Sequence, residues 1–236
     1  MISNFNSPTP FVFIHANKTG GNAINKALDN YGYKYPNDYN FTHNEITFPH
    51  SQHWTLQELS MVVNIDEHYT FSISRNPWDR MVSYYRKNVC NPVSDAWVNA
   101  DFNDWVEKAF VEKSTPEYQD RIDERYVHKG PQYSKIHDGI RNIEECYYYM
   151  LNSEGEIGVD YVIEFSLLNK GFKEVSKNLG LDLILKEVPQ MRSNIRTHNG
   201  RFYDIKSYHE MYNNKSIDII QNNFSNDIKF FNYEYE

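Results

Sequence analysis

The sequence has 236 residues, of which 40% are hydrophobic and 16% aromatic, and its formal net charge is −8. This composition supports one substantial core, so we predict a single domain over residues 1–236. The acidic balance argues against a general nucleic-acid binder, and the polar stretch Met1–Pro10 predicts neither a signal peptide nor a membrane span. We therefore expect a cytoplasmic protein.

The first predicted unit is a strand, a loop and a helix. The short apolar run Phe11–Ile14 is typical of a central strand. Apolar residues then recur at the i, i+3, i+4, i+7 spacing of a helix packed on a sheet, with Gly32 as the expected stop. These residues are Ile24, Ala27, Leu28 and Tyr31.

The loop between this strand and helix has the composition of an anion site. Gly20 and Gly21 let several backbone N–H groups converge at the N-terminus of a helix, where the dipole favours negative charge. Lys18 adds a cation and Thr19 a hydroxyl donor. The loop is not a Walker A motif, because Lys18 precedes the glycines. An ordinary tight connection is the alternative, and the loop alone leaves both interpretations open.

The next segment combines a predicted loop with a short helix. Residues Tyr33–Pro49 are rich in Asn, Tyr, Pro and His and are expected to form a long loop. Thr55 and Glu58 have the spacing of a capping box, which predicts a helix beginning at Leu56. His53 then lies just ahead of a helix start.

A second strand runs into a helix further along the chain. Tyr69, Phe71 and Ile73 alternate as in a strand, and Pro77 suits the first turn of a helix. The predicted buried stripe of that helix is Trp78, Met81, Val82, Tyr85 and Val89. Arg75 at the strand end and Ser83 two turns along the helix could bind one anion from two directions. Alternatively, Arg75 and Arg80 pair with Asp79 or another surface acid.

These two stretches resemble a known family. The strand and the run Lys18-Thr-Gly-Gly resemble the 5′-phosphosulfate loop of PAPS-dependent sulfotransferases, in the branch that resembles the carbohydrate (heparan/chondroitin-type) enzymes. The run Arg75-Asn-Pro-Trp-Asp-Arg-Met-Val-Ser-Tyr-Tyr85 is similar to the 3′-phosphate motif of that branch. The order and separation of the motifs also fit. The resemblance implies an α/β, P-loop-kinase-like three-layer fold with a mostly parallel central sheet.

The resemblance continues through the tail, with departures. Residues Asn152–Phe165 resemble the turn and strand before a family helix, which Gly180 is expected to end. Asn17 replaces a family proline and Asn22 the usual Thr or Ser. Further departures are Ser166, Arg192 and Asn194.

The resemblance implies sulfuryl transfer from PAPS to an acceptor hydroxyl, expected on a carbohydrate, with PAP as product and no metal. Lys18 would stabilise the bridging oxygen. The 5′-phosphate and sulfate would be held by Thr19 and by the backbone turn of Gly20, Gly21, Asn22 and Ala23. Arg75 and Ser83 would hold the 3′-phosphate.

A histidine is the expected general base, because neutral imidazole titrates in the useful range. His53 fits the place of a family histidine before a short helix, with His50 and Glu45 as the remaining options. A metal site made by His43, His50 and His53 ranks below a base, because their spacing is not that of metal ligands. His15 is expected to be a packed residue.

Other features leave alternatives open. The chain could be a degenerate nucleotide-binding module without turnover, or a P-loop-like phosphotransferase. Gln132 could line the acceptor cleft or belong to a plain turn. The run Tyr147–Tyr149 could stack on a sugar or adenine, but we favour an aromatic core strand. Arg192 and Arg196, in a polar loop after Pro189, could reach the nucleotide or an acidic acceptor, but we favour solvated surface arginines. A second long loop is expected at 91–139. Cys90 and Cys146 are expected as reduced thiols. The expected partner is a small-molecule or glycan acceptor, with no nucleic acid, and the oligomeric state is open.

Overall fold

The chain forms two compact units, Met1–Arg75 with Glu144–Gln190 and Asn76–Ile143 with Met191–Glu236. This computed structural model describes residues 8–29, 40–43, 46–49, 53–61, 63–90, 101–113, 143–183, 185, 194–196, 202–204 and 207–235. Each unit has its own cluster of buried hydrophobic side chains.

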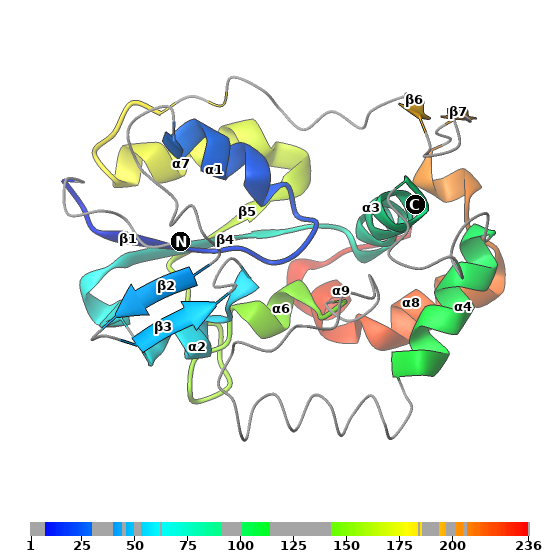
Figure 1. Ribbon diagram of the computed structural model, residues 1–236, viewed down its shortest axis with the longest axis horizontal. Coiled ribbons are helices and arrows are strands. Elements are labelled where there is room, and N and C mark those ends of the chain that lie inside the picture. The colour runs from blue at the N-terminus through cyan, green and yellow to red at the C-terminus, as the bar shows by residue number, and fades with distance from the viewer. Residues whose placement is uncertain are drawn as a thin grey trace. The chain divides into compact units, whose positions relative to one another are not determined.

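A parallel sheet organises the first unit (Figure 1). Its strands are β1 (Phe11–Ile14), β4 (Tyr69–Ser74) and β5 (Tyr161–Glu164), in the order β1-β4-β5. Because β4 has a neighbour on each side, almost every residue along it is buried. The prediction of an α/β chain with a parallel sheet is confirmed.

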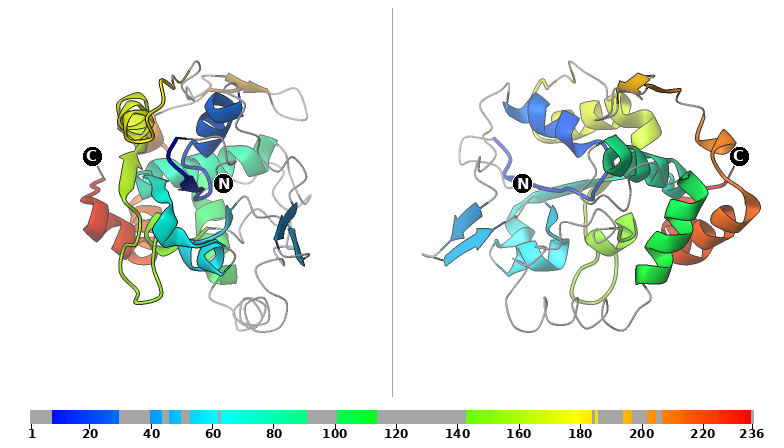
Figure 2. Two further views of the ribbon diagram at one scale, coloured as in Figure 1. Left: turned by 90° about the vertical axis from the view of Figure 1, so that its left-hand side faces the viewer. Right: turned by 45° about the vertical axis from the view of Figure 1, so that its right-hand side comes forward.

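Helices α1 (Gly21–Asp29) and α7 (Leu168–Asn178) lie together on one face of this sheet (Figures 1 and 2). Their apolar stripes join the strand side chains in one core that includes Ile24, Phe71 and Phe172. The helix α7 stops as predicted, since Gly180 follows it with a left-handed φ of 67°.

Short helices lie on the other side of the sheet in Figure 1. They are α2 (Leu56–Ser60) and α6 (Cys146–Tyr149), while the single turns η2 (Ile65–Glu67) and η5 (Phe165–Leu167) flank the strands. The predicted capping box is confirmed, because Thr55 accepts from the Glu58 backbone N–H and the Glu58 carboxylate accepts from the Thr55 N–H. Cys146 is buried and forms no disulfide with another described residue, in line with the expected reduced thiol.

Two predictions for the first unit were wrong. The expected loop Tyr33–Pro49 contains an antiparallel pair, β2 (Asn40–His43) and β3 (Ile46–Pro49), whose aromatic and β-branched residues favour strands. The expected strand Tyr147–Tyr149 belongs to the helix α6, where Met150 N–H bonds to the Tyr147 carbonyl. Burial of Cys146, Tyr149 and Met150 at i, i+3 and i+4 follows the helical period.

The described part of the second unit is mainly helical. Its helices are α3 (Pro77–Cys90), α4 (Phe102–Lys113), α8 (Asn214–Asn223) and α9 (Ser225–Phe231), with η6 (Tyr208–Glu210) before α8. Its core contains the predicted residues Trp78, Met81, Val82 and Tyr85. The side chain of Val89 lies outside the described residues.

Two predictions for the second unit were also wrong. The expected loop 91–139 contains α4, whose buried Phe102, Trp105, Val106, Ala109 and Phe110 recur at helical spacing. Arg196 lies in a strand rather than a polar loop, because β6 (Asn194–Arg196) pairs with β7 (Phe202–Asp204). Pairing with β7 makes Asn194–Arg196 a strand. The sequence does not show this, because three residues are too few to establish an alternating pattern.

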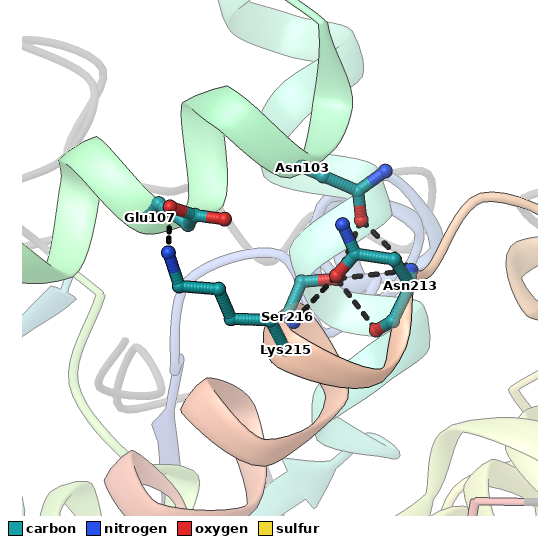
Figure 3. Close-up of polar contacts among 5 residues, drawn as sticks. All are labelled: Asn103, Glu107, Asn213, Lys215 and Ser216. Atoms are coloured by element: carbon teal, nitrogen blue, oxygen red, sulfur yellow. Dashed lines mark hydrogen bonds and ion pairs between the residues drawn. The ribbon is translucent and has the colours of Figure 1, made fainter.

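Polar contacts tie α8 to α4 within this unit (Figure 3). Asn213 caps α8 by accepting from the Ser216 N–H at 2.8 Å, and its own N–H donates to the Asn103 side-chain oxygen at 2.9 Å. Lys215 pairs with Glu107 at 2.5 Å. None of the helices in the described ranges is long and apolar enough to cross a membrane.

Candidate functional site

The three parallel strands β1, β4 and β5 all end at the same edge of the sheet. His15 follows β1, Arg75 follows β4 and Phe165 follows β5. The carboxyl ends of parallel strands meet at the same edge, which is where ligands bind in open α/β sheets. The residues predicted from the two motifs therefore start from neighbouring positions.

The two motifs are in contact. Arg75 Nη1 donates a hydrogen bond to the backbone carbonyl of Lys18 at 2.8 Å. Arg75 is only 6% exposed, and its guanidinium carbon lies 4.1 Å from the centre of the Phe165 ring, which is a cation–π arrangement. The arginine at the end of β4 thus supports the lysine loop.

The loop after β1 is tightly turned. Lys18 has a φ of 64° and Gly20 a φ of 89°, so two of three consecutive residues are left-handed. The Thr19 hydroxyl donates to the Ala16 carbonyl at 2.8 Å, and the Ala23 N–H donates to the Gly20 carbonyl at 2.9 Å. Helix α1 begins directly afterwards, so its first N–H groups are directed towards the loop.

Aromatic rings occupy the space beside both glycines. A Cβ atom on Gly20 would lie 2.6 Å from Cε2 of Phe165. A Cβ atom on Gly21 would lie 2.2 Å from Nε2 and Cδ2 of His15. Contacts this short cannot form, so each position requires glycine for packing, and Gly20 also requires it for its backbone angle.

His53 contacts the end of β1. Its Nδ1 atom lies 2.9 Å from the backbone carbonyl oxygen of His15, and the two imidazole rings are 4.7 Å apart. A carbonyl oxygen only accepts, so Nδ1 carries the proton. In neutral His53, the lone pair is therefore on Nε2.

His15 is buried, as predicted, with 4% of its surface exposed. Burial lowers the pKa of His15 well below its ordinary value of 6.5, and repulsion from Lys18, and from His53 when that ring is protonated, lowers the pKa further. Its ring stacks on Phe13 at 5.4 Å. The imidazole is thus a neutral packing group between β1 and Gly21.

The amino-acid pattern of a known family covers these elements. The model of the sulfotransferase family matches residues 5–234. The chain belongs to the sulfotransferase family.

No curated protein sequence matched this one. The crystal structure of a sulfotransferase from Alicyclobacillus acidocaldarius is similar with a TM-score of 0.34 and 15% sequence identity. That likeness covers 75% of this chain and 60% of the solved one, so this chain spans less than two thirds of its length.

The structure of this sulfotransferase family member gathers most of the predicted site residues in the first unit. Lys18, Arg75 and His53 lie around the loop that contains Gly20 and Gly21. Asn22 is exposed on the first turn of α1. The Thr19 side chain is fully buried and donates to Ala16, so its predicted role in anion binding depends on its backbone N–H.

The other arginine of the second motif is buried in the second unit. Arg80 lies 3.8 Å from Asp227, and both side chains are 0% exposed. The hypothesis that Arg80 pairs with an acid is confirmed, but the acid is a buried residue of α9 rather than a surface one. Ser83 is a partly buried residue of α3, and its role stays a prediction.

Several candidate residues lie outside the described ranges. Glu45, His50, Gln132 and Arg192 are among them, and only the backbone of His43 and Arg196 is described. Within the described ranges, no group of three His, Cys, Asp or Glu side chains is placed to hold a metal ion.

Sequence reasoning missed the contribution of Phe165. It was part of the stretch Asn152–Phe165, but no role was predicted for it. Its position directly after a strand that neighbours β4 is a usable signal, since it places the ring beside Arg75.

Proposed function

We propose that this protein is a PAPS-dependent sulfotransferase that transfers a sulfuryl group to an acceptor hydroxyl by in-line displacement. The observation that carries the proposal is the hydrogen bond from Arg75 Nη1 to the Lys18 carbonyl, because it joins the residues that head the two phosphate motifs. Membership of the sulfotransferase family supports it.

The residues around the loop fit a phosphosulfate group. The cation of Lys18 and the N–H groups at the start of α1 are suited to an anion, and the glycines bring the backbone close. In the proposal, Lys18 and the N–H groups of Thr19, Gly20, Gly21 and Asn22 bind the 5′ end. Ala23 completes the turn through its N–H bond to Gly20. Arg75 and Ser83 bind the 3′-phosphate.

The proposed general base is His53. The hydrogen bond at Nδ1 leaves Nε2 as the atom that accepts the proton from the acceptor hydroxyl. PAPS supplies the activated sulfuryl group when it is bound. Lys18 would stabilise the negative charge that develops on the leaving phosphate oxygen.

Finer features of the proposal come from the family resemblance and the sequence. They are a carbohydrate acceptor, a P-loop-kinase-like three-layer fold, one domain over residues 1–236, a cytoplasmic location and chemistry without a metal. The departures at Asn17 and Asn22 predict a change in donor affinity rather than its loss, since Asn22 keeps its backbone N–H.

Calorimetry tests the donor. PAP should bind with a stoichiometry of one, and ATP with Mg²⁺ should bind much more weakly. Preferential binding of ATP with Mg²⁺ would reject the proposal in favour of a phosphotransferase. A sulfate-transfer assay against a panel of glycan and small hydroxyl acceptors then tests turnover. PAP binding with no transfer to any acceptor would favour a binding module.

A further inference from the structure

The ring of Phe165 is placed beside Arg75 by the sheet. In the parallel pair of β4 and β5, Ser74 lies opposite Glu164. The next residues, Arg75 and Phe165, therefore leave neighbouring strands at the same edge. The guanidinium carbon of Arg75 lies 4.1 Å from the ring centre. Stacking on a ring holds the guanidinium plane while its N–H groups point outwards along that plane.

The same ring contacts the anion loop. A Cβ atom on Gly20 would lie 2.6 Å from Cε2 and 3.0 Å from Cδ2 of Phe165, so the ring edge lies against the Gly20 backbone. A methyl carbon of Leu168 would lie 3.6 Å from that Cβ position and closes the contact from α7. The left-handed residue Gly20 is thus held from outside the loop.

Arg75 connects this contact to the second left-handed residue. Lys18 has a φ of 64°, which is unfavourable for a residue with a side chain. Its carbonyl accepts from Arg75 Nη1 at 2.8 Å. Phe165 contacts both Gly20 and Arg75, and Arg75 binds Lys18. Thr19 joins Lys18 to Gly20 along the chain, so these contacts form a closed ring. The left-handed backbone conformation of Lys18 persists only where surrounding contacts hold it in place.

We propose that Phe165 is a positioning residue that holds the anion loop and the Arg75 guanidinium in one arrangement. The inference rests on the proposed function, in which the loop binds the 5′ end and Arg75 the 3′-phosphate of one nucleotide. Because one ring supports both, its loss weakens the binding of a ligand that uses both ends. Phe165 itself need not contact the ligand.

The test compares Phe165→Leu and Phe165→Tyr by calorimetry with PAP. Leucine keeps an apolar side chain but removes the aromatic face, so we expect PAP to bind about tenfold more weakly. Tyrosine keeps the ring and should restore affinity to within about twofold of the parent protein. If Phe165→Leu does not fold, Phe165→Met replaces it with the same expectation. Affinity for PAP unchanged in the folded variant would overturn the inference.

A matched control separates positioning from general stability. Phe172 is buried in the core of the same unit and is 1% exposed. Phe172→Leu should lower the melting temperature without changing PAP affinity. An equal loss of PAP affinity in Phe172→Leu and Phe165→Leu would show a general packing effect and overturn the inference. Failure of the parent protein to bind PAP would instead reject the proposed function.

A double-mutant cycle with Arg75→Lys measures the coupling. Lysine keeps the charge but lacks the planar group that stacks on the ring. Each single variant should weaken PAP binding by some factor. The double variant should weaken PAP binding by less than the product of these two factors, because both substitutions remove the same contact. A full product of the two effects would contradict a shared role.

Discussion

His53 donates a hydrogen bond from Nδ1 to the backbone carbonyl oxygen of His15 at 2.9 Å. The first residue after β1 thereby sets which imidazole nitrogen of His53 can accept a proton. The bond needs no side-chain chemistry from His15, since any residue there has a carbonyl. The His15 ring has a separate role, because it packs on Gly21 at the start of α1.

Replacing His53 should stop turnover and spare donor binding. We expect His53→Ala to lower kcat by about 10²- to 10⁴-fold, because the acceptor hydroxyl loses its base. The affinity for PAP should stay within about twofold, measured by calorimetry, since no donor contact is proposed for His53. The control His68→Gln changes a histidine of the same unit outside the site, and it should change neither value. A His53→Ala protein with full activity would return attention to His50 and Glu45.

The buried His15 should make stability depend on pH. Its pKa is lowered by burial in the folded state, so below about pH 6.5 the unfolded chain binds more protons than the folded one. The free energy of unfolding should therefore fall as the pH decreases below this value. His15→Phe cannot be protonated, and its urea-unfolding free energy should fall less over the same range. An equal fall in both proteins would show that other groups cause the dependence.

Alanine substitutions at Gly20 and Gly155 distinguish the effect of a steric clash from that of backbone strain. Both have a left-handed φ, of 89° and 80°, but a Cβ atom on Gly155 would have no neighbour within 4 Å. Gly155→Ala should cost about 1 kcal/mol of unfolding free energy from strain alone. Gly20→Ala should cost more and should also weaken PAP binding, because the Phe165 ring has to move. If the two variants lose the same free energy of unfolding in urea and Gly20→Ala binds PAP as the parent protein does, the Phe165 ring is not packed against the loop.

The buried pair of Arg80 and Asp227 should stabilise the second unit only as a pair. Arg80→Met removes the positive charge beside a fully buried carboxylate and should cost about 3 kcal/mol of unfolding free energy. The double variant Arg80→Met with Asp227→Leu removes both charges and should regain most of that loss. Chemical unfolding of the parent protein, the two single variants Arg80→Met and Asp227→Leu, and the double variant gives the coupling energy. If the double variant is no more stable than Arg80→Met, the buried charge of Asp227 is not the cause of the loss.

The residues of the loop and the strands were predictable because their signals are local. An apolar run, a glycine pair and a helical stripe each depend on neighbours in the chain, as does the capping box at Thr55 and Glu58. The helix α4 carried an equally local signal in its buried stripe, and the prediction of a loop there overlooked it. The strands β2, β3 and β6 were harder, because three or four residues become a strand through their partner.

The sequence by itself determined that a lysine–glycine loop and an arginine each follow a buried strand, and this led to the family. Tertiary structure decided what these side chains contact. The Arg75 guanidinium reaches the Lys18 carbonyl across 57 positions of the chain, and the Phe165 ring joins them from a third strand. No local pattern contains such pairs, because the order and register of the parallel strands, rather than sequence spacing, bring their ends together.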